Sequence, residues 1–171
     1  MTEKGRRISR SLIQLAGIIV LTVVDRLIKN AVYVSLPDRG TIEVIPGFLG
    51  LSYAENTGAA FSLFSSSTTV LSVITGVLIL AGLAILFAVK NKPLIYDICI
   101  PLIIAGGAGN QLDRLTRGFV IDYIKTLFID FPIFNFADCL ITCSCIAVIV
   151  YLIYDIIRDS SKKTADGEKN D

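Results

Sequence analysis

Four long apolar runs alternate with more polar segments along this chain. They cover about residues 12–34, 69–89, 94–112 and 138–157, and each is close to the roughly 20 residues that a helix needs to cross a bilayer. The pattern predicts a mainly α membrane protein with four transmembrane helices. We expect one domain over residues 1–158, followed by a disordered cytoplasmic tail over the charged residues 159–171.

The first run follows a cluster of basic residues, as the apolar core of a secretory signal peptide does. No convincing A-x-A cleavage site comes after it, and the apolar pattern continues past Asp25 and Lys29 to Val34. We therefore expect this first helix to be retained.

Basic residues near the ends of the runs predict how the helices are oriented, because cytoplasmic loops are enriched in Lys and Arg. They gather before the first run, between the second and third runs, and after the fourth, as Lys4, Arg6, Arg7, Arg10, Lys90, Lys92, Arg158, Lys162 and Lys163. Both termini are therefore predicted to be cytoplasmic. The two long connections, about residues 36–68 and 113–137, then form outer loops.

The first outer loop contains two strand-like runs at residues 41–45 and 48–54, separated by the turn signal Pro46-Gly47. It predicts a small extracytoplasmic antiparallel β-sheet that rests on the membrane surface. The apolar piece at residues 59–64 is expected to enter the membrane interface. The second outer loop is also partly apolar, so we expect both loops to lie against lipid.

Composition removes several classes of function. A net charge of +1 and a mean hydropathy of +0.69 exclude a strongly basic nucleic-acid binder and an ordinary soluble domain. The chain has no histidine, which excludes His-based triads and His metal sites. Its four cysteines lie inside apolar runs in a spacing that is not typical of metal sites, so we interpret them as small buried residues. We expect no metal and no organic cofactor.

Several polar residues of the apolar runs are expected at one depth. A helix rises about 1.5 Å per residue, which places Asp25 about 22 Å above Arg10 and Asn110 about 24 Å above Leu94. The same outer layer of the membrane is expected to hold Lys29, Arg114 and Asp138, and Asp122 follows Asn110 closely enough to return to it. The pattern makes a polar site at the outer face geometrically possible.

Each of these residues also has a structural interpretation. Asp25 and Lys29 are four residues apart and can neutralise each other on one helix face. Arg114 can pair with Asp113 or with a lipid phosphate. The glycines Gly106, Gly107 and Gly109 can permit close helix packing.

The strongest structural alternative concerns the start of the fourth helix. Asn135 is a good N-cap, and Asp138 would then complete an arrangement like a capping box. A second carboxylate nearby, Asp122, favours chemistry instead. Carboxylates are costly beside lipid, and two at one surface can share a proton and activate water, as in an aspartyl peptidase.

Five blocks of residues, in this order, resemble the lipoprotein signal peptidases, the signal peptidase II family of bacterial membrane aspartyl peptidases. The blocks read DRLIK, NTGAAF, GGAGNQLDR, GFVIDY and FNFAD, at residues 25–29, 56–61, 106–114, 118–123 and 134–138. One block alone is weak evidence, whereas five in order on four predicted spans are highly specific. Cys139 stands where a small polar residue is more usual.

The resemblance implies that Asp122 and Asp138 are the catalytic pair. It also implies supporting site residues, namely Asp25, Lys29, Asn56, Gly106, Asn110, Arg114 and Asn135. The implied reaction is removal of the signal peptide of a prolipoprotein just before a diacylglyceryl-modified cysteine. It would take place at the outer face of the bacterial cytoplasmic (inner) membrane. The expected partners are this substrate and membrane lipids, with no nucleic acid, and we expect a monomer.

For the mechanism, we expect an ionised Asp138 to take a proton from water while a protonated Asp122 polarises the scissile carbonyl. Asn56 is expected to donate to the developing oxyanion, and Asn110 and Arg114 to hold the pair or the substrate. Two other functions stay open. A small transporter would use the acids as an ion relay, and a non-enzymatic assembly factor would use the polar residues only to pair helices.

Overall fold

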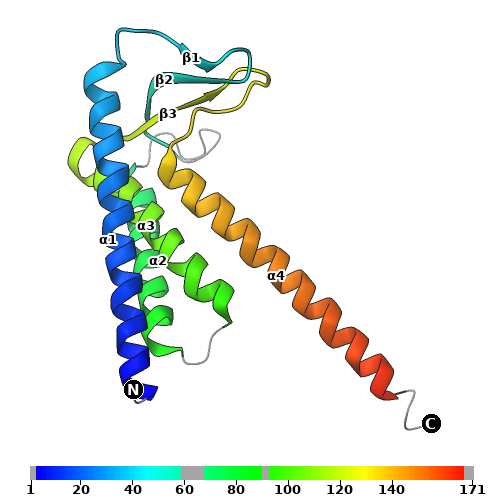
Figure 1. Ribbon diagram of the computed structural model, residues 1–171. Coiled ribbons are helices and arrows are strands. Elements are labelled where there is room, and N and C mark those ends of the chain that lie inside the picture. Colours follow the sequence, from blue (N-terminus) through cyan, green and yellow to red (C-terminus); the bar gives the residue numbers. More distant parts are fainter. Residues whose placement is uncertain (1–2, 59–67, 90–92, 168–171) are drawn as a thin grey trace.

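The computed structural model describes residues 3–58, 68–89 and 93–167. Its helices are α1 (Glu3–Ser35), α2 (Thr68–Ala88), α3 (Leu94–Arg117) and α4 (Phe136–Gly167), and its strands are β1 (Ile42–Ile45), β2 (Leu49–Asn56) and β3 (Val120–Thr126). All four helices are long and apolar enough to cross a membrane, which confirms the predicted fold class. Figure 1 shows the sheet at one end of the helices, with the start of α1 and the end of α4 at the other.

Helix α3 is the central element, because it packs against each of the other three helices. Small residues allow the close approach. A methyl group on Gly106 would lie 2.5 Å from the carbonyl oxygen of Ala137 in α4, and one on Gly107 would touch Ile79 in α2. A methyl group on Gly109 would collide with the Asp25 carboxylate of α1. The predicted packing role is confirmed for Gly106 and Gly109, whereas a methyl group on Gly107 would make an ordinary van der Waals contact with Ile79, at 3.4 Å.

The small sheet has the strand order β1-β2-β3, and both pairs are antiparallel. The predicted turn at Pro46-Gly47 is present, with a hydrogen bond of 3.0 Å from Phe48 N to Ile45 O and a left-handed φ of 66° at Gly47. Strand β3 was not predicted, because its partner strand is far away in the chain. Its register pairs Asp122 with Ala54 and Val120 with Asn56.

Two predicted boundaries differ from the structure. Helix α3 continues to Arg117, so the second outer segment begins at Gly118 and not at residue 113. Gly118 ends the helix with a left-handed φ of 83°, which suits glycine. Helix α4 continues to Gly167, beyond the boundary at Asp159 where the disordered tail was predicted. No proline interrupts that stretch, and Arg158 pairs with Asp155 at 2.6 Å to support the helix.

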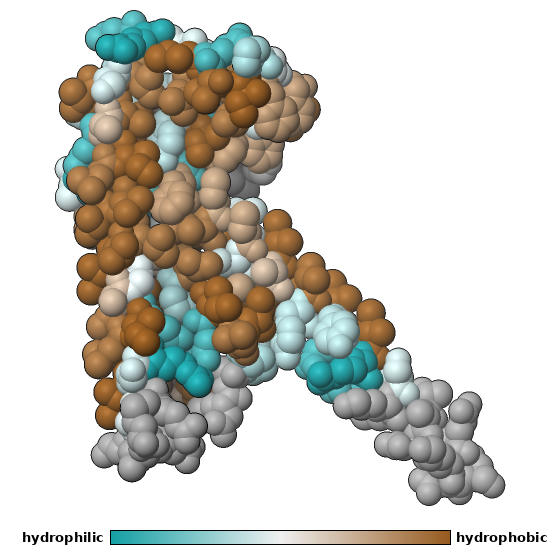
Figure 2. Space-filling view, in the orientation of Figure 1, coloured by the Kyte–Doolittle hydropathy of each residue, from teal (hydrophilic) through white to brown (hydrophobic). Residues whose placement is uncertain are grey.

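Two further predictions concern residues that were expected in apolar surroundings. Of the four cysteines, only Cys99 is buried, so the prediction of burial was wrong for Cys143 and Cys145. They lie on the exposed surface of α4, where apolar residues face outward as well. Figure 2 shows this apolar surface running over the helices. The interfacial piece predicted at residues 59–64 lies outside the described residues.

Apolar packing forms two buried clusters. One lies among the helices and contains Ile18, Leu86, Ile104 and Ala105. The other lies beneath the sheet and contains Val32, Leu36, Ile121 and Tyr123. The second cluster anchors β3 to the C-terminal end of α1, and this attachment places Asp122 next to the helices.

Candidate active site

The polar residues expected at one depth do meet, at the junction of α1, α3, β3 and the start of α4. Asp25, Lys29, Asp113 and Asn135 are 0% exposed, and Asp122 is 2% exposed. Such burial of polar and charged groups is stable only when they are paired or hydrogen-bonded. The contacts below supply these partners.

Asp122 projects from β3, and two amides hold its carboxylate. Asn135 Nδ2 donates to Oδ1 at 2.6 Å, and Asn56 Nδ2 donates to Oδ2 at 2.8 Å. Asn56 reaches this position because β2 lies beside β3. The expected donation of Asn56 to an oxyanion is therefore not its contact in this structure, where it holds Asp122.

Asp138 lies in the first turn of α4 and forms the capping box that the sequence suggested. Its backbone N–H donates to Asn135 Oδ1 at 3.0 Å, and Asn135 N donates to Asp138 Oδ2 at 3.0 Å. The other carboxylate oxygen is not used by the cap. Asn110 Nδ2 of α3 donates to it at 2.8 Å. Capping and a tertiary site thus coexist at one residue.

Asn110 and Asn135 connect the two carboxylates. Asn135 Nδ2 also donates to Asn110 Oδ1, at 3.2 Å, so a continuous set of hydrogen bonds runs from Asp122 to Asp138. Lys29 Nζ donates to the same Asn110 oxygen at 2.7 Å. These contacts define the orientation of both amides, because a carboxylate can only accept from the NH₂ group and an ammonium can only donate to the oxygen.

The pKa of Asp122 is raised to about 6. Burial is the main cause, and the negative charge of Asp138 acts in the same direction. The hydrogen bonds from Asn56 and Asn135 and the positive charge of Lys29 act in the opposite direction. Asp122 thus takes up a proton far more readily than an ordinary carboxyl group. The chemical result is a pair of interacting carboxyl groups, one of which still holds a proton at mildly acidic pH, where an ordinary carboxyl group is ionised.

The neighbouring Tyr123 supports the start of α4. Burial raises the pKa of its hydroxyl to about 12, so the group is neutral. This hydroxyl accepts the backbone N–H of Phe136 at 3.3 Å. It thereby satisfies one of the N–H groups that a helix N-terminus leaves without an intrahelical partner.

The predicted pairing of Asp25 and Lys29 is confirmed, with 2.9 Å between Oδ2 and Nζ. The pair is not isolated, because Lys29 Nζ is also 3.2 Å from Asp113 Oδ2. Arg114 is half-buried, and its charge interacts with those of Asp138, Asp122 and Asp113. The structural interpretation of Arg114 was a pairing with Asp113 or with a lipid phosphate. The structure also brings Arg114 near both Asp122 and Asp138.

Asp113 was not predicted as a site residue, because the sequence suggested it only as a partner for Arg114. The carboxylate is fully buried and forms ion pairs with Arg26, Lys29 and Arg117. Its spacing of four residues from Arg117 was an available signal. Within the described residues, no group of three or more Cys, Asp or Glu side chains is arranged to hold a metal ion.

Comparisons with known proteins show a similarity that extends over most of the chain. Residues 17–154 match the model of a protein family described as signal peptidase (SPase) II. The lipoprotein signal peptidase of Lactococcus lactis subsp. lactis (strain IL1403) is 35% identical over 146 residues, which are 85% of this chain and 97% of the relative. That of Enterococcus faecalis (strain ATCC 700802 / V583) is 38% identical over 115 residues, which are 67% of this chain and 71% of the relative.

Solved structures show the same similarity. One, described as a bacterial membrane enzyme, has a TM-score of 0.78 and 30% sequence identity, and the match covers 84% of this chain and 88% of that one. A second structure with the same description has a TM-score of 0.74 and 30% identity, and the match covers 83% and 93%.

Proposed function

Because this chain belongs to the signal peptidase II family, whose members are aspartic peptidases, we propose that it cleaves the signal peptide of prolipoproteins with Asp122 and Asp138 as its catalytic pair. The substrate is a diacylglyceryl-modified prolipoprotein, and the cut falls just before the lipidated cysteine. One observation carries the proposal: Asn110 and Asn135 hold the two carboxyl groups in one hydrogen-bonded network.

In the proposed reaction, the ionised Asp138 takes a proton from a water molecule, whose oxygen attacks the scissile carbonyl carbon. The protonated Asp122 donates a hydrogen bond to the carbonyl oxygen and polarises it. The amine leaves when the C–N bond breaks and takes up the proton that came from water. No covalent bond to the enzyme forms.

The assignment of the proton to Asp122 is supported by two features. Burial and the charge of Asp138 raise the pKa of Asp122 to about 6. Asp138 lies at the N-terminus of α4, where the helix dipole favours a negative charge, and it accepts N–H donors from Asn135 and Asn110. The two titrations are coupled, so the first proton leaves the pair at lower pH than the second.

The supporting residues have distinct proposed roles. Asn56 and Asn135 hold Asp122, and Asn110 holds Asp138. Lys29, neutralised in part by Asp25, fixes the oxygen of Asn110 so that its NH₂ group faces Asp138. Two other implied residues act differently: Gly106 permits α4 to approach α3, and Arg114 supplies positive charge beside the pair.

We further propose that the protein is a monomer in the bacterial cytoplasmic membrane, with cytoplasmic termini and the site at the outer face. The start of α1 and the end of α4 both lie at the end of the molecule opposite the sheet and the site, although α4 diverges from α1 toward that end (Figure 1). Four spans require this arrangement, and the basic flanks of the sequence select the orientation.

The test is a cleavage assay in detergent with a diacylglyceryl-modified prolipoprotein and its unmodified form. We expect cleavage of the modified substrate only, and a loss of about 10²- to 10⁴-fold in rate for Asp122→Asn and for Asp138→Asn. Asp97→Asn is the matched control, because Asp97 lies at the other end of α3 and pairs with Arg10. Normal cleavage by either dyad variant removes that residue from the catalytic pair. No cleavage by folded wild type favours the ion-relay alternative.

A further inference from the structure

The carboxylate of Asp113 has two oxygens with different neighbours. Oδ1 accepts a hydrogen bond from Arg26 Nη1 at 2.5 Å and another from Arg117 Nη1. Oδ2 lies 3.2 Å from Lys29 Nζ and accepts the backbone N–H of Ile121 at 3.3 Å. One side of the carboxylate thus contacts arginines, and the other contacts two groups that lead toward the catalytic pair.

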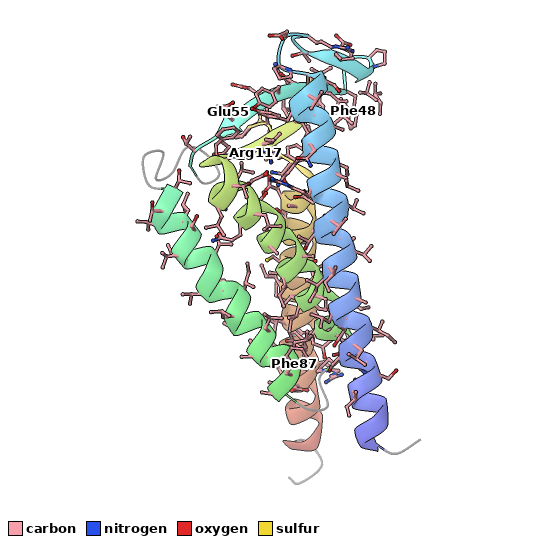
Figure 3. All side chains as sticks on the ribbon, turned by 90° about the vertical axis from the view of Figure 1, so that its left-hand side faces the viewer. Phe48, Glu55, Phe87 and Arg117 are labelled. Carbon is pink, nitrogen blue, oxygen red and sulfur yellow. The ribbon has the colours of Figure 1, made fainter. Side chains whose placement is uncertain are left out.

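The arginine side joins helices. Arg26 belongs to α1, and its Nη2 also donates to Thr116 of α3 at 3.2 Å. Arg117 lies at the outer end of α3, beside α1 (Figure 3). Its Nη2 donates to Asn30 of α1 at 2.6 Å, and its guanidinium lies 5.2 Å from the centre of the Tyr33 ring. These contacts hold α1 against α3 and touch neither catalytic carboxylate.

The other side reaches Asp122 through the backbone. Ile121 directly precedes Asp122 in β3, and its side chain is 0% exposed. In the sheet, Ile121 pairs with Glu55 of β2. The hydrogen bond from Ile121 N to Asp113 therefore ties the strand segment that carries Asp122 to α3.

The same oxygen reaches Asp138 through two side chains. Lys29 Nζ, held at 3.2 Å from Asp113 Oδ2, donates to Asn110 Oδ1 at 2.7 Å. Asn110 Nδ2 then donates to Asp138 Oδ1 at 2.8 Å. Asp113 is therefore the point where the supports of the two catalytic carboxylates meet.

We propose that Asp113 is a positioning residue of the peptidase, whose Oδ2 sets the relative position of Asp122 and Asp138 while its Oδ1 joins α1 to α3. The inference rests on the proposed function of the two aspartates. Donors surround the carboxylate on both sides, so it must accept at both oxygens. An asparagine in its place offers one accepting oxygen and one NH₂ group, and therefore loses one side whichever way it is turned.

The experiment compares Asp113→Asn with wild type, as full-length proteins in detergent, with diacylglyceryl-modified prolipoprotein as substrate. We expect kcat per folded enzyme to fall about 10- to 100-fold, because small displacements of catalytic groups are costly in rate. KM should change little, because Asp113 is fully buried and is therefore not accessible to the substrate.

The pH profile separates positioning from a loss of folded protein, since the folded fraction changes only the height of the curve. Asp122 is faced by Asp138 from α4, by Lys29 from α1, by Arg114 from α3 and by the neutral amide of Asn56 from β2. Without the Asp113 anion, the charge of Lys29 is less neutralised. We expect the alkaline limb of kcat/KM to move to lower pH by about half a unit.

Two control variants are matched to the two sides of the carboxylate. Asp97→Asn removes an aspartate that pairs with an arginine of α1 at the opposite end of α3, and Arg117→Gln removes a donor from Oδ1 only. Both should lower the melting temperature and leave kcat and the alkaline limb close to those of wild type.

The outcomes are distinct. If wild type and Asp97→Asn cleave but Asp113→Asn shows wild-type kcat and an unmoved limb, the positioning role is overturned and the proposed function stands. If wild type itself does not cleave, the proposed function fails. If Asp113→Asn does not fold, the double variant Asp113→Asn/Arg117→Gln keeps the local net charge and takes its place. Because the local net charge is kept, the readout of the double variant is kcat per folded enzyme. A wild-type kcat overturns the role, and a kcat that is about 10- to 100-fold lower supports it.

Discussion

The interface between α1 and α3 contains an arginine–aspartate pair at each of its ends, and the two pairs differ in burial. At the inner end, Arg10 contacts Asp97 at 2.9 Å, and the arginine side chain is 60% exposed. At the outer end, Arg26 contacts Asp113 at 2.5 Å, with 29% of the arginine and none of the aspartate exposed. The chemistry of the contact is the same, but the surroundings are not.

The inner pair joins α1 to α3 at the end of the helices opposite the sheet. Gln14 adds two hydrogen bonds to Asp97, and Figure 3 shows this end of the helices far from the sheet, where Phe87 marks the end of α2. The outer pair continues into a network that includes Lys29, Asn110 and the two carboxylates proposed to be catalytic. Burying charge is costly, and replacing a buried ion pair with apolar residues is often neutral or stabilising. The outer network is therefore better explained by the geometry it imposes than by stability.

The largest expected difference between the two ends follows removal of one cation from each. Lys29→Met leaves Asp25 buried without its ion-pair partner, and we expect the free energy of unfolding to fall by about 3–5 kcal/mol. Arg10→Met removes an exposed partner, and we expect a loss of about 0–1 kcal/mol. Unfolding titrations in mixed detergent micelles measure both. Equal losses would show that burial does not separate the two ends.

The pH dependence of stability should show the same contrast. The folded-state pKa of Asp122, about 6, lies above the ordinary value of 3.8, so folding is favoured while the group is protonated. This contribution is complete below pH 4 and is lost as pH rises through about 6, and it amounts to about 3 kcal/mol. Asp122→Asn should flatten this part of the stability curve. Asp97→Asn at the inner end should retain it, and a curve flattened by both variants would contradict the assignment to Asp122.

A smaller effect is expected from added methyl groups. Gly109 faces Asp25, and a methyl group there would lie 2.9 Å from the carboxyl carbon, whereas Gly76 of α2 has nothing within 4 Å. We expect Gly109→Ala to destabilise the protein by about 1–3 kcal/mol and Gly76→Ala to change stability by less than about 0.5 kcal/mol. Thermal unfolding of the two variants in one detergent provides the comparison. A neutral Gly109→Ala would mean that α1 and α3 can separate at the site without cost.

Much of the fold was available from local pattern. Each apolar run becomes a helix because it satisfies all its backbone hydrogen bonds within itself, which a lipid environment requires. The turn at Pro46-Gly47, the pairing of Asp25 with Lys29 and the cap formed by Asn135 and Asp138 all involve residues within four positions of each other. Such contacts follow from the geometry of a turn or a helix.

What the sequence by itself determined, then, was the number of helices, the hairpin, the cap and the set of polar residues at one depth. Only the tertiary structure decided that β3 joins the sheet, that Asn56 holds Asp122, and that Asp113 contacts both α1 and β3. These contacts join segments far apart in the chain, and no local periodicity encodes them. They arise from the packing of α3 against its neighbours, which brings buried polar groups of different elements within hydrogen-bonding distance. The order of residues along the chain does not specify which of these groups become partners.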